Sequence, residues 1–270
     1  EDYNKELICE GGGIFSRSAN SIPLSTEMKK MLGTKKASMM PNELIRASLM
    51  MPVDLFWNGG IGTYVKAKSE TDAQVGDRAN DALRVNGSEL KAKVFGEGGN
   101  LGATQLGRIE FAQSGGRINT DFVDNVGGVD CSDNEVNIKI LLNQLVNEGE
   151  LTKKHRDQLL YDMTDAVSDI VIHDCYRQTH TISVTELKGH SLLKEQLRFI
   201  HELEKMGKLD RELEFLPSDE EIAERQAQGK GFTRPELSVL VAYGKMILKE
   251  QFAIDEINDN PYYVPLLIKS

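Results

Sequence analysis

The chain has 270 residues and a formal net charge of -10; 40% of its residues are hydrophobic and 27% are charged. This is the composition of a globular protein with enough chain for one large domain or two modest ones. The acidic balance argues against binding to nucleic acid, which needs basic surfaces. No apolar run approaches the roughly 20 residues that span a bilayer, so we expect no membrane partner.

The three cysteines, Cys9, Cys131 and Cys175, are far apart in the sequence. Their number and spacing suit a reducing compartment, so we expect a cytoplasmic protein, and they provide neither a disulfide framework nor a metal-binding motif. The chain begins at Glu1 with no Met and no signal-peptide pattern. We therefore expect it to be a piece of a longer polypeptide.

Glycine clusters divide the first half of the chain at intervals typical of alternating helices and strands. Proline in the first turn predicts a helix over residues 41–50. Residues 69–72 resemble a capping box and predict a helix that continues to about residue 84, and residues 104–112 predict another. Strands are predicted over residues 52–57, 91–95 and 117–123. Helices that alternate with strands in this way indicate a parallel sheet.

After Ser132 the sequence has the periodicity of helices. These are predicted over residues 134–147, 152 to about 181, about 185 to 206, a short segment from 217, and 237–252. The predicted fold class is therefore α/β, with a partial Rossmann-like parallel sheet followed by an all-helical region. The predicted domains are residues 1–130, the later part of a Rossmann-like nucleotide-binding domain, and residues 131–270, a carboxyl-terminal helical region.

Two glycine clusters, residues 94–104 (VFGEGGNLGAT) and 124–132 (DNVGGVDCS), each carry one Asn among their glycines. Glycine has no Cβ and lets the backbone approach a ligand, while the Asn amide both donates and accepts hydrogen bonds. Loops at the carboxyl ends of parallel strands open onto the same crevice, where ligands bind. We therefore predict a nucleotide site at these two clusters, both interpreted as loops after strands.

The spacing of the first cluster departs from the dinucleotide fingerprint G-x-G-x-x-G, because Leu101 stands where the third glycine is expected and Gly102 follows one residue late. The acidic residue that should close the next strand is also missing. A simple strand-to-helix turn therefore remains an alternative to a ligand loop. Asn58 lies in a third glycine loop, residues 57–63, which is open to the same two interpretations.

Five segments carry more specific signals: residues 57–66 (WNGGIGTYVK), 76–84 (GDRANDALR), 96–102 (GEGGNLG), 117–125 (RINTDFVDN) and 231–237 (GFTRPEL). Together they closely resemble the large bacterial NAD-specific glutamate dehydrogenases, and the resemblance covers essentially the whole chain. It implies an NAD-dependent dehydrogenase that oxidatively deaminates L-glutamate to 2-oxoglutarate and ammonium, with hydride transfer to NAD. It also implies that the full-length enzyme is a homo-oligomer.

The resemblance extends to the loops of the short, hexameric glutamate dehydrogenases, whose E-G-A-N-x-P-T and N-A-G-G-V-x-x-S motifs are similar to residues 97–104 and 125–132. It implies that Asn100 and Asn125 flank the nicotinamide and its ribose. The full set of residues implied to lie at the cofactor is Asn58, Gly98, Gly99, Asn100 and Asn125. The residues implied to approach the glutamate side chain are Val129 and Ser132.

In this family the catalytic Lys and Asp precede the nucleotide-binding domain, so the resemblance implies no catalytic residue in this chain and no activity for it in isolation. Lys66, Lys91 and Lys93 match no catalytic motif. Two alternatives remain open. One is a nucleotide-binding module without redox chemistry, and the other is a helical oligomerisation segment without a ligand.

Overall fold

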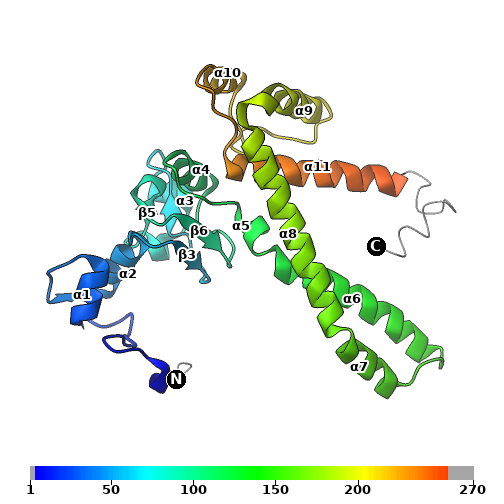
Figure 1. The fold of residues 1–270 in the computed structure, drawn as a ribbon, viewed down its shortest axis with the longest axis horizontal. Coiled ribbons are helices and arrows are strands. Elements are labelled where there is room, and N and C mark those ends of the chain that lie inside the picture. The colour runs from blue at the N-terminus through cyan, green and yellow to red at the C-terminus, as the bar shows by residue number, and fades with distance from the viewer. Residues whose placement is uncertain (1–3, 255–270) are drawn as a thin grey trace. The chain divides into compact units, whose positions relative to one another are not determined.

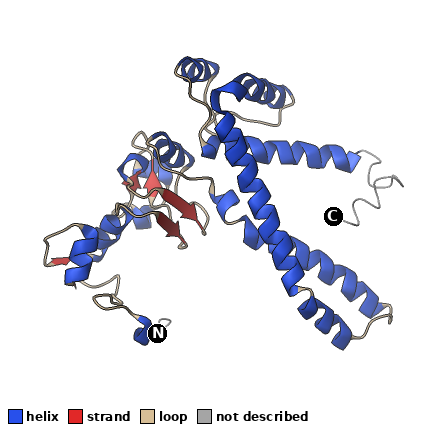
Figure 2. Ribbon diagram, viewed as in Figure 1, coloured by secondary structure: helices blue, strands red, loops and turns tan. Residues whose placement is uncertain are grey.

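The computed structural model describes residues 4–254. Its contacts divide the chain into two compact units, the first up to Tyr176 and the second from Arg177, so that the division falls within one long helix. All strands among the described residues belong to the first unit, and the second is helical (Figures 1 and 2). The predicted α/β class with a large helical region is confirmed. The predicted domains 1–130 and 131–270 stay a prediction, and their outer ends, residues 1–3 and 255–270, lie outside the described residues.

The strands of the first unit are β1 (Ile22–Pro23), β2 (Ser38–Met39), β3 (Leu55–Asn58), β4 (Val65–Lys66), β5 (Val85–Asn86) and β6 (Val94–Glu97). Its helices are α1 (Thr26–Leu32), α2 (Pro41–Leu49), α3 (Asp72–Val75), α4 (Gln105–Gln113), α5 (Asp121–Asp124), α6 (Val126–Asn147) and α7 (Lys153–Asp162). Helix α8 (Thr164–Lys188) runs from the first unit into the second, which also contains α9 (Leu193–Lys205), α10 (Asp219–Ala227) and α11 (Arg234–Ile254).

The pairing of β3 with β6 forms the parallel sheet that leads to the glycine loops. The register places Asn58 opposite Glu97 and Phe56 opposite Phe95. The rings of Phe56 and Phe95 stack with centroids 5.4 Å apart. Strands β4 and β5 form a second parallel pair, and β1 and β2 pair antiparallel. Side chains alternate across a strand, so the same alternation that buries Phe95 also turns Glu97 toward the core.

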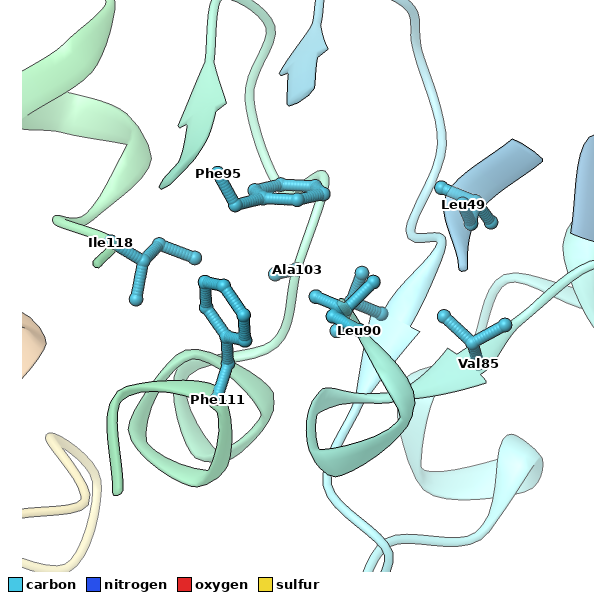
Figure 3. Packing of buried hydrophobic residues seen from close by; sticks show 8 residues of the cluster. Leu49, Val85, Leu90, Phe95, Ala103, Phe111 and Ile118 are labelled. Carbon is cyan, nitrogen blue, oxygen red and sulfur yellow. The ribbon is translucent and has the colours of Figure 1, made fainter. Parts of the chain in front are cut away.

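Buried apolar side chains from β4, β5, β6, α2, α4 and the segments that connect them form the core of the first unit (Figure 3). Phe95 packs edge-on against Phe111 of α4, with ring centroids 6.5 Å apart. Such contacts add to the free energy gained by removing the rings from water. The buried members of the cluster are Leu49, Val65, Val85, Leu90, Phe95, Ala103, Phe111 and Ile118.

Thr104 caps the start of helix α4, because its hydroxyl accepts a hydrogen bond from the Gly107 backbone N–H at 3.0 Å. Gly107 also brings the helix against β4: a Cβ at this position would lie 2.9 Å from both the Cα and the carbonyl carbon of Lys66. The absence of a side chain at Gly107 is therefore what allows α4 to cross the strand so closely.

The predicted strand over residues 117–123 is wrong. Only Arg117 pairs with the sheet, through a single bridge to Val94, and the chain then turns into the short helix α5. Asp121 explains the change, because its carboxylate accepts a hydrogen bond from the Phe122 backbone N–H at 2.9 Å. Local hydrogen bonds of this kind from Asp side chains compete with a sheet ladder.

The second glycine cluster is not a loop after a strand, as predicted, but the first turns of helix α6, which begins at Val126. Helix packing overrides the low helix propensity of its glycines. A Cβ at Gly127 would lie 3.5 Å from the Cys175 sulfur on α8, which is an ordinary van der Waals distance. Gly128 faces open space.

Three predicted helices have different bounds in the structure. The capping box lies at Thr71 and Gln74 rather than at residues 69–72, and α3 ends at Gly76, whose left-handed φ of 77° stops it. The helix predicted from residue 152 to 181 is interrupted at Met163, between α7 and α8. The helix predicted over residues 185–206 begins within α8 and continues, after one 3-10 turn, as α9.

The second unit has its own apolar core, which includes Ile182, Ile200, Leu203, Ile222, Leu237 and Leu240. Helix α10 begins with a capping box in which the Ser218 hydroxyl accepts from the Glu221 backbone N–H. Buried Glu236 accepts two hydrogen bonds from the Arg225 guanidinium, at 2.8 Å and 2.9 Å. These interactions join α10 to the start of α11.

Candidate functional site

Three of the predicted Asn and Gly segments come together at the carboxyl ends of β3 and β6. The Asn125 side-chain amide donates to the Asn100 side-chain oxygen at 2.5 Å and to the Gly99 carbonyl at 3.4 Å. The Asn58 carbonyl accepts from the backbone N–H groups of Gly98 at 2.9 Å and Gly99 at 3.2 Å. All five residues that the sequence placed at a cofactor are thus in one cluster, which we call the Asn cluster.

Asn58 is buried, yet its side-chain Nδ2 has no hydrogen-bond partner among the described residues. The amide faces Gly102, where any Cβ would collide with it. A buried donor without an acceptor costs free energy, which is recovered when a ligand supplies the acceptor. This orphaned amide therefore fits a site for a polar ligand.

The glycines of the first cluster are required by close backbone approach. A Cβ at Gly99 would lie 2.8 Å from the Gly60 carbonyl oxygen, and one at Gly98 would lie 2.6 Å from the indole nitrogen of Trp57. Leu101, which replaces the third glycine of the fingerprint, takes the left-handed φ of 58° that glycine would adopt without cost. For a residue with a Cβ this conformation costs about 1–2 kcal/mol, so the surrounding structure must hold it.

An ionic network lies directly beneath this loop. Buried Glu97 accepts two hydrogen bonds from Arg108 of α4, from Nε at 2.7 Å and from Nη2 at 2.9 Å, and a third from the Ala103 backbone N–H at 3.0 Å. Nη2 of Arg108 also lies 3.3 Å from Asp121. The network therefore ties both ends of the 97–104 loop to α4 and α5.

Electrostatics in this network follow from its burial. Burial raises the pKa of the Glu97 carboxyl above its ordinary value, while the Arg108 guanidinium opposes the rise. Burial also disfavours the Arg108 cation, but the Glu97 and Asp121 carboxylates outweigh it and raise the pKa of Arg108. Arg108 therefore remains charged, and its fork geometry suits the two-bonded contact with Glu97.

The neighbouring 59–63 loop is held by Arg84, whose side chain is completely buried. Its guanidinium donates to the Thr63 carbonyl at 2.9 Å and the Asp77 carbonyl at 2.6 Å, and it forms ion pairs with Asp72 and Asp81. The Thr63 hydroxyl in turn donates to the Leu101 carbonyl at 2.7 Å. This contact joins the 59–63 loop to the loop of the Asn cluster.

The two residues predicted to approach the substrate lie on α6. Val129 and Ser132 follow Asn125 by four and seven residues, so all three share one face of the helix, and both side chains are exposed. This exposed face of α6 therefore extends away from the Asn cluster, beginning at Asn125. The role of Val129 and Ser132 at a substrate stays a prediction.

Sequence reasoning missed Arg84, Arg108 and Asp121, which fix the loops without resembling a binding motif. One signal was present: Arg108 directly precedes the apolar residue Ile109 and lies one helical turn after Thr104, on the buried part of a short helix. A charge at such a position requires a buried partner. The sequence did not show that the partners are Glu97 and Asp121.

Within residues 4–254, no group of three or more His, Cys, Asp or Glu side chains has the arrangement of a metal site. No helix in that part of the chain is both long and apolar enough to cross a membrane.

Comparison with known proteins gives two family matches. Residues 1–185 match the family model for the bacterial NAD-glutamate dehydrogenase catalytic domain, and residues 229–270 match the carboxyl-terminal model of glutamate dehydrogenase. The first match covers more than half of the chain, including every residue of the Asn cluster.

Curated relatives agree with the family matches. Over 97% of the chain, it is 58% identical to the NAD-specific glutamate dehydrogenase of Halomonas elongata and 56% identical to that of Pseudomonas aeruginosa. Over 98% of the chain, it is 50% identical to that of Mycobacterium tuberculosis. The chain spans only 16% of the length of the first two and 17% of the third. Because the catalytic-domain model covers the residues that build the site and these relatives match nearly the whole chain, the chain belongs to the bacterial NAD-glutamate dehydrogenase family.

Proposed function

We propose that this chain supplies the nicotinamide side of the NAD site in an NAD-specific glutamate dehydrogenase. The complete enzyme would convert L-glutamate to 2-oxoglutarate and ammonium. The observation that carries the proposal is the Asn cluster, in which Asn125 is hydrogen-bonded to Asn100 at the carboxyl ends of two parallel strands. Ligands of open α/β sheets bind at that edge.

The residues present fit a dinucleotide. The unpaired Nδ2 of Asn58 offers a buried donor. Gly98 and Gly99 have no Cβ, which lets this loop pack closely against Trp57 and Gly60. Asn100 and Asn125 would hold the nicotinamide amide and ribose, since neutral amides orient polar groups without adding charge. When bound, NAD supplies the acceptor for the hydride that leaves the α-carbon of L-glutamate.

The substrate would lie along α6. We place the glutamate side chain near Val129 and Ser132, which extend the surface that begins at Asn125. The chain's contribution is to position substrate and cofactor against each other and to exclude water, which lowers the entropic part of the barrier. Proton transfer by Lys and Asp is assigned to another part of the complete enzyme, so the isolated chain is expected to be inactive.

The test is glutamate-dependent formation of NADH by the complete polypeptide that contains this chain. Asn100→Ala should lower the rate about tenfold or more, as expected when a ligand-orienting hydrogen bond is lost. The matched control is Asn137→Ala on α6, because the Asn137 amide is exposed and donates to the Asp133 carbonyl of its own helix, at 2.8 Å. If no NADH forms with glutamate, or if both variants lose the same activity, the proposal is wrong.

The two alternatives make different predictions for the same protein. A nucleotide-binding module without redox chemistry would bind ATP or nucleotide sugars rather than NADH and would form no NADH from glutamate. A purely oligomeric segment would bind neither nucleotide. The homo-oligomeric state and the cytoplasmic location of the enzyme also remain proposals.

A further inference from the structure

Asp121 contacts both halves of the Asn cluster without belonging to it. Its Oδ2 accepts a hydrogen bond from the Leu101 backbone N–H at 2.8 Å, next to Asn100. Asp121 is also the first residue of α5, whose last turn leads to Asn125; the Asn125 backbone N–H donates to the Asp121 carbonyl at 2.9 Å. Asp121 therefore holds the backbone beside Asn100 and at Asn125, the two residues whose side-chain amides are hydrogen-bonded to each other.

Both side-chain oxygens of Asp121 face hydrogen-bond donors. Oδ1 accepts from the Phe122 backbone N–H at 2.9 Å and lies 3.3 Å from Nη2 of Arg108, while Oδ2 accepts from Leu101. A carboxylate can accept at both oxygens, whereas an Asn at this position would turn an NH₂ group toward one set of donors. The change from Asp to Asn therefore breaks a contact while keeping the size of the side chain.

Leu101 shows why this contact is needed. Its left-handed φ of 58° is unfavourable for a residue with a Cβ, and its side chain is 64% exposed, so apolar packing does not hold it. Hydrogen bonds at its N–H to Asp121 and at its carbonyl to the Thr63 hydroxyl hold the backbone instead. If the bond to Asp121 is lost, the loop can relax and carry Asn100 away from Asn125.

We propose that Asp121 is a positioning residue for the cofactor site: it holds the strained Leu101 backbone so that Asn100 meets Asn125 in the geometry that receives the nicotinamide. This inference rests on the proposed NAD site. It assigns the preorganisation of that site to one buried carboxylate that touches neither cofactor nor substrate.

The test compares Asp121→Asn with Glu110→Gln in the complete polypeptide. Glu110 is a matched control, because its carboxylate also accepts from two backbone N–H groups, those of Lys68 at 2.7 Å and Ser88 at 2.8 Å, in loops outside the Asn cluster. We expect Asp121→Asn to raise the Kd for NADH roughly tenfold or more, as for a lost hydrogen bond to a charged group, whereas Glu110→Gln should leave it within about twofold. Urea unfolding of both variants shows whether a raised Kd for NADH reflects weaker binding by folded protein or a smaller fraction of folded protein.

A double mutant shows whether Asp121 acts through Asn100. In an Asn100→Ala background, Asp121→Asn should cause little further loss of NADH affinity, because the group that it positions is gone. If the two losses multiply, or if Asp121→Asn and Glu110→Gln weaken NADH binding equally, Asp121 has only a structural role and the inference is overturned. If the wild-type polypeptide itself fails to bind NADH, the proposed NAD site is wrong, and the two failures are thereby distinguished.

Discussion

The Arg108 guanidinium and the Glu97 carboxylate are joined by two hydrogen bonds, at 2.7 Å and 2.9 Å, with side-chain exposures of only 5% and 0%. Two opposite charges at this depth stabilise the fold only as a pair, since each is costly to bury alone. They also connect the end of β6 to α4, so the pair determines where the loop of the Asn cluster leaves the sheet.

Breaking this pair should strongly destabilise the first unit. We expect Arg108→Met to lower the free energy of unfolding by about 3–5 kcal/mol, because Glu97 is left as an uncompensated buried charge. The double variant Arg108→Met, Glu97→Gln should lose less than the sum of the two single variants. Urea unfolding followed by the fluorescence of Trp57, the single tryptophan of the chain, measures this directly. Additive losses would show that the two side chains do not act as a pair.

Gly107 and Gly244 are both helical glycines, but Ala should have opposite effects at the two positions. At Gly107 a Cβ would meet the Lys66 backbone at 2.9 Å, whereas at Gly244 in α11 nothing lies within 4 Å. Gly107→Ala should therefore destabilise by roughly 1–3 kcal/mol through overpacking, and Gly244→Ala should stabilise by about 0.5–1 kcal/mol through helix propensity. Denaturation followed by circular dichroism tests both, and a neutral Gly107→Ala would mean that α4 shifts freely from β4.

Arg84 should not tolerate replacement by Lys. The ammonium group cannot reproduce the fork that donates to Thr63, Asp72, Asp77 and Asp81, so Arg84→Lys should destabilise by about 2–4 kcal/mol. An exposed ion pair gives the contrast: Lys36→Ala, which removes the bond to Glu43, should change stability by about 1 kcal/mol or less. Equal effects in urea unfolding would contradict the role assigned to the Arg84 network.

The second unit should show an alkaline transition from Tyr243. Burial and its hydrogen bond to Glu214, at 2.8 Å, raise the pKa of Tyr243 from 10.0 to about 12. Because the folded-state pKa is the higher one, the stabilising contribution is complete below pH 10.0 and is lost as the pH rises toward about 12. The difference in unfolding free energy between the wild type and Tyr243→Phe should therefore be constant up to pH 10.0 and shrink above it. A difference that stays constant throughout would contradict the raised pKa.

Much of the α/β part could be predicted from local pattern. The proline at the first turn of α2, the apolar strands β3 and β6, and the helix after Thr104 each have signals contained within a few residues. The approach of Asn58 to the glycine loop of Asn100 also follows, because the carboxyl ends of β3 and β6 lie side by side. Asn125 reaches the same place after α5 and not at the end of a predicted strand.

The failures have a common physical cause, which is that tertiary contacts override local preference. Residues 117–123 have the composition of a strand, but Asp121 replaces ladder bonds with its own contacts to Leu101 and Phe122. Gly127 and Gly128 look like loop residues, yet they are helical in α6. The pairing of Glu97 with Arg108 spans 11 residues and depends on how α4 folds back, which the sequence pattern does not show.

The central claim is that the Asn cluster binds the nicotinamide part of NAD, and a fluorescence titration of the complete polypeptide with NADH tests it most directly. We expect saturable binding that excess ATP does not displace, weakened about tenfold or more by Asn125→Ala and unchanged by Asn137→Ala. The reason is that Asn125, unlike the control residue Asn137, is hydrogen-bonded to Asn100 and Gly99. Absence of NADH binding, displacement by ATP, or equal affinity in the wild type and Asn125→Ala would contradict the claim.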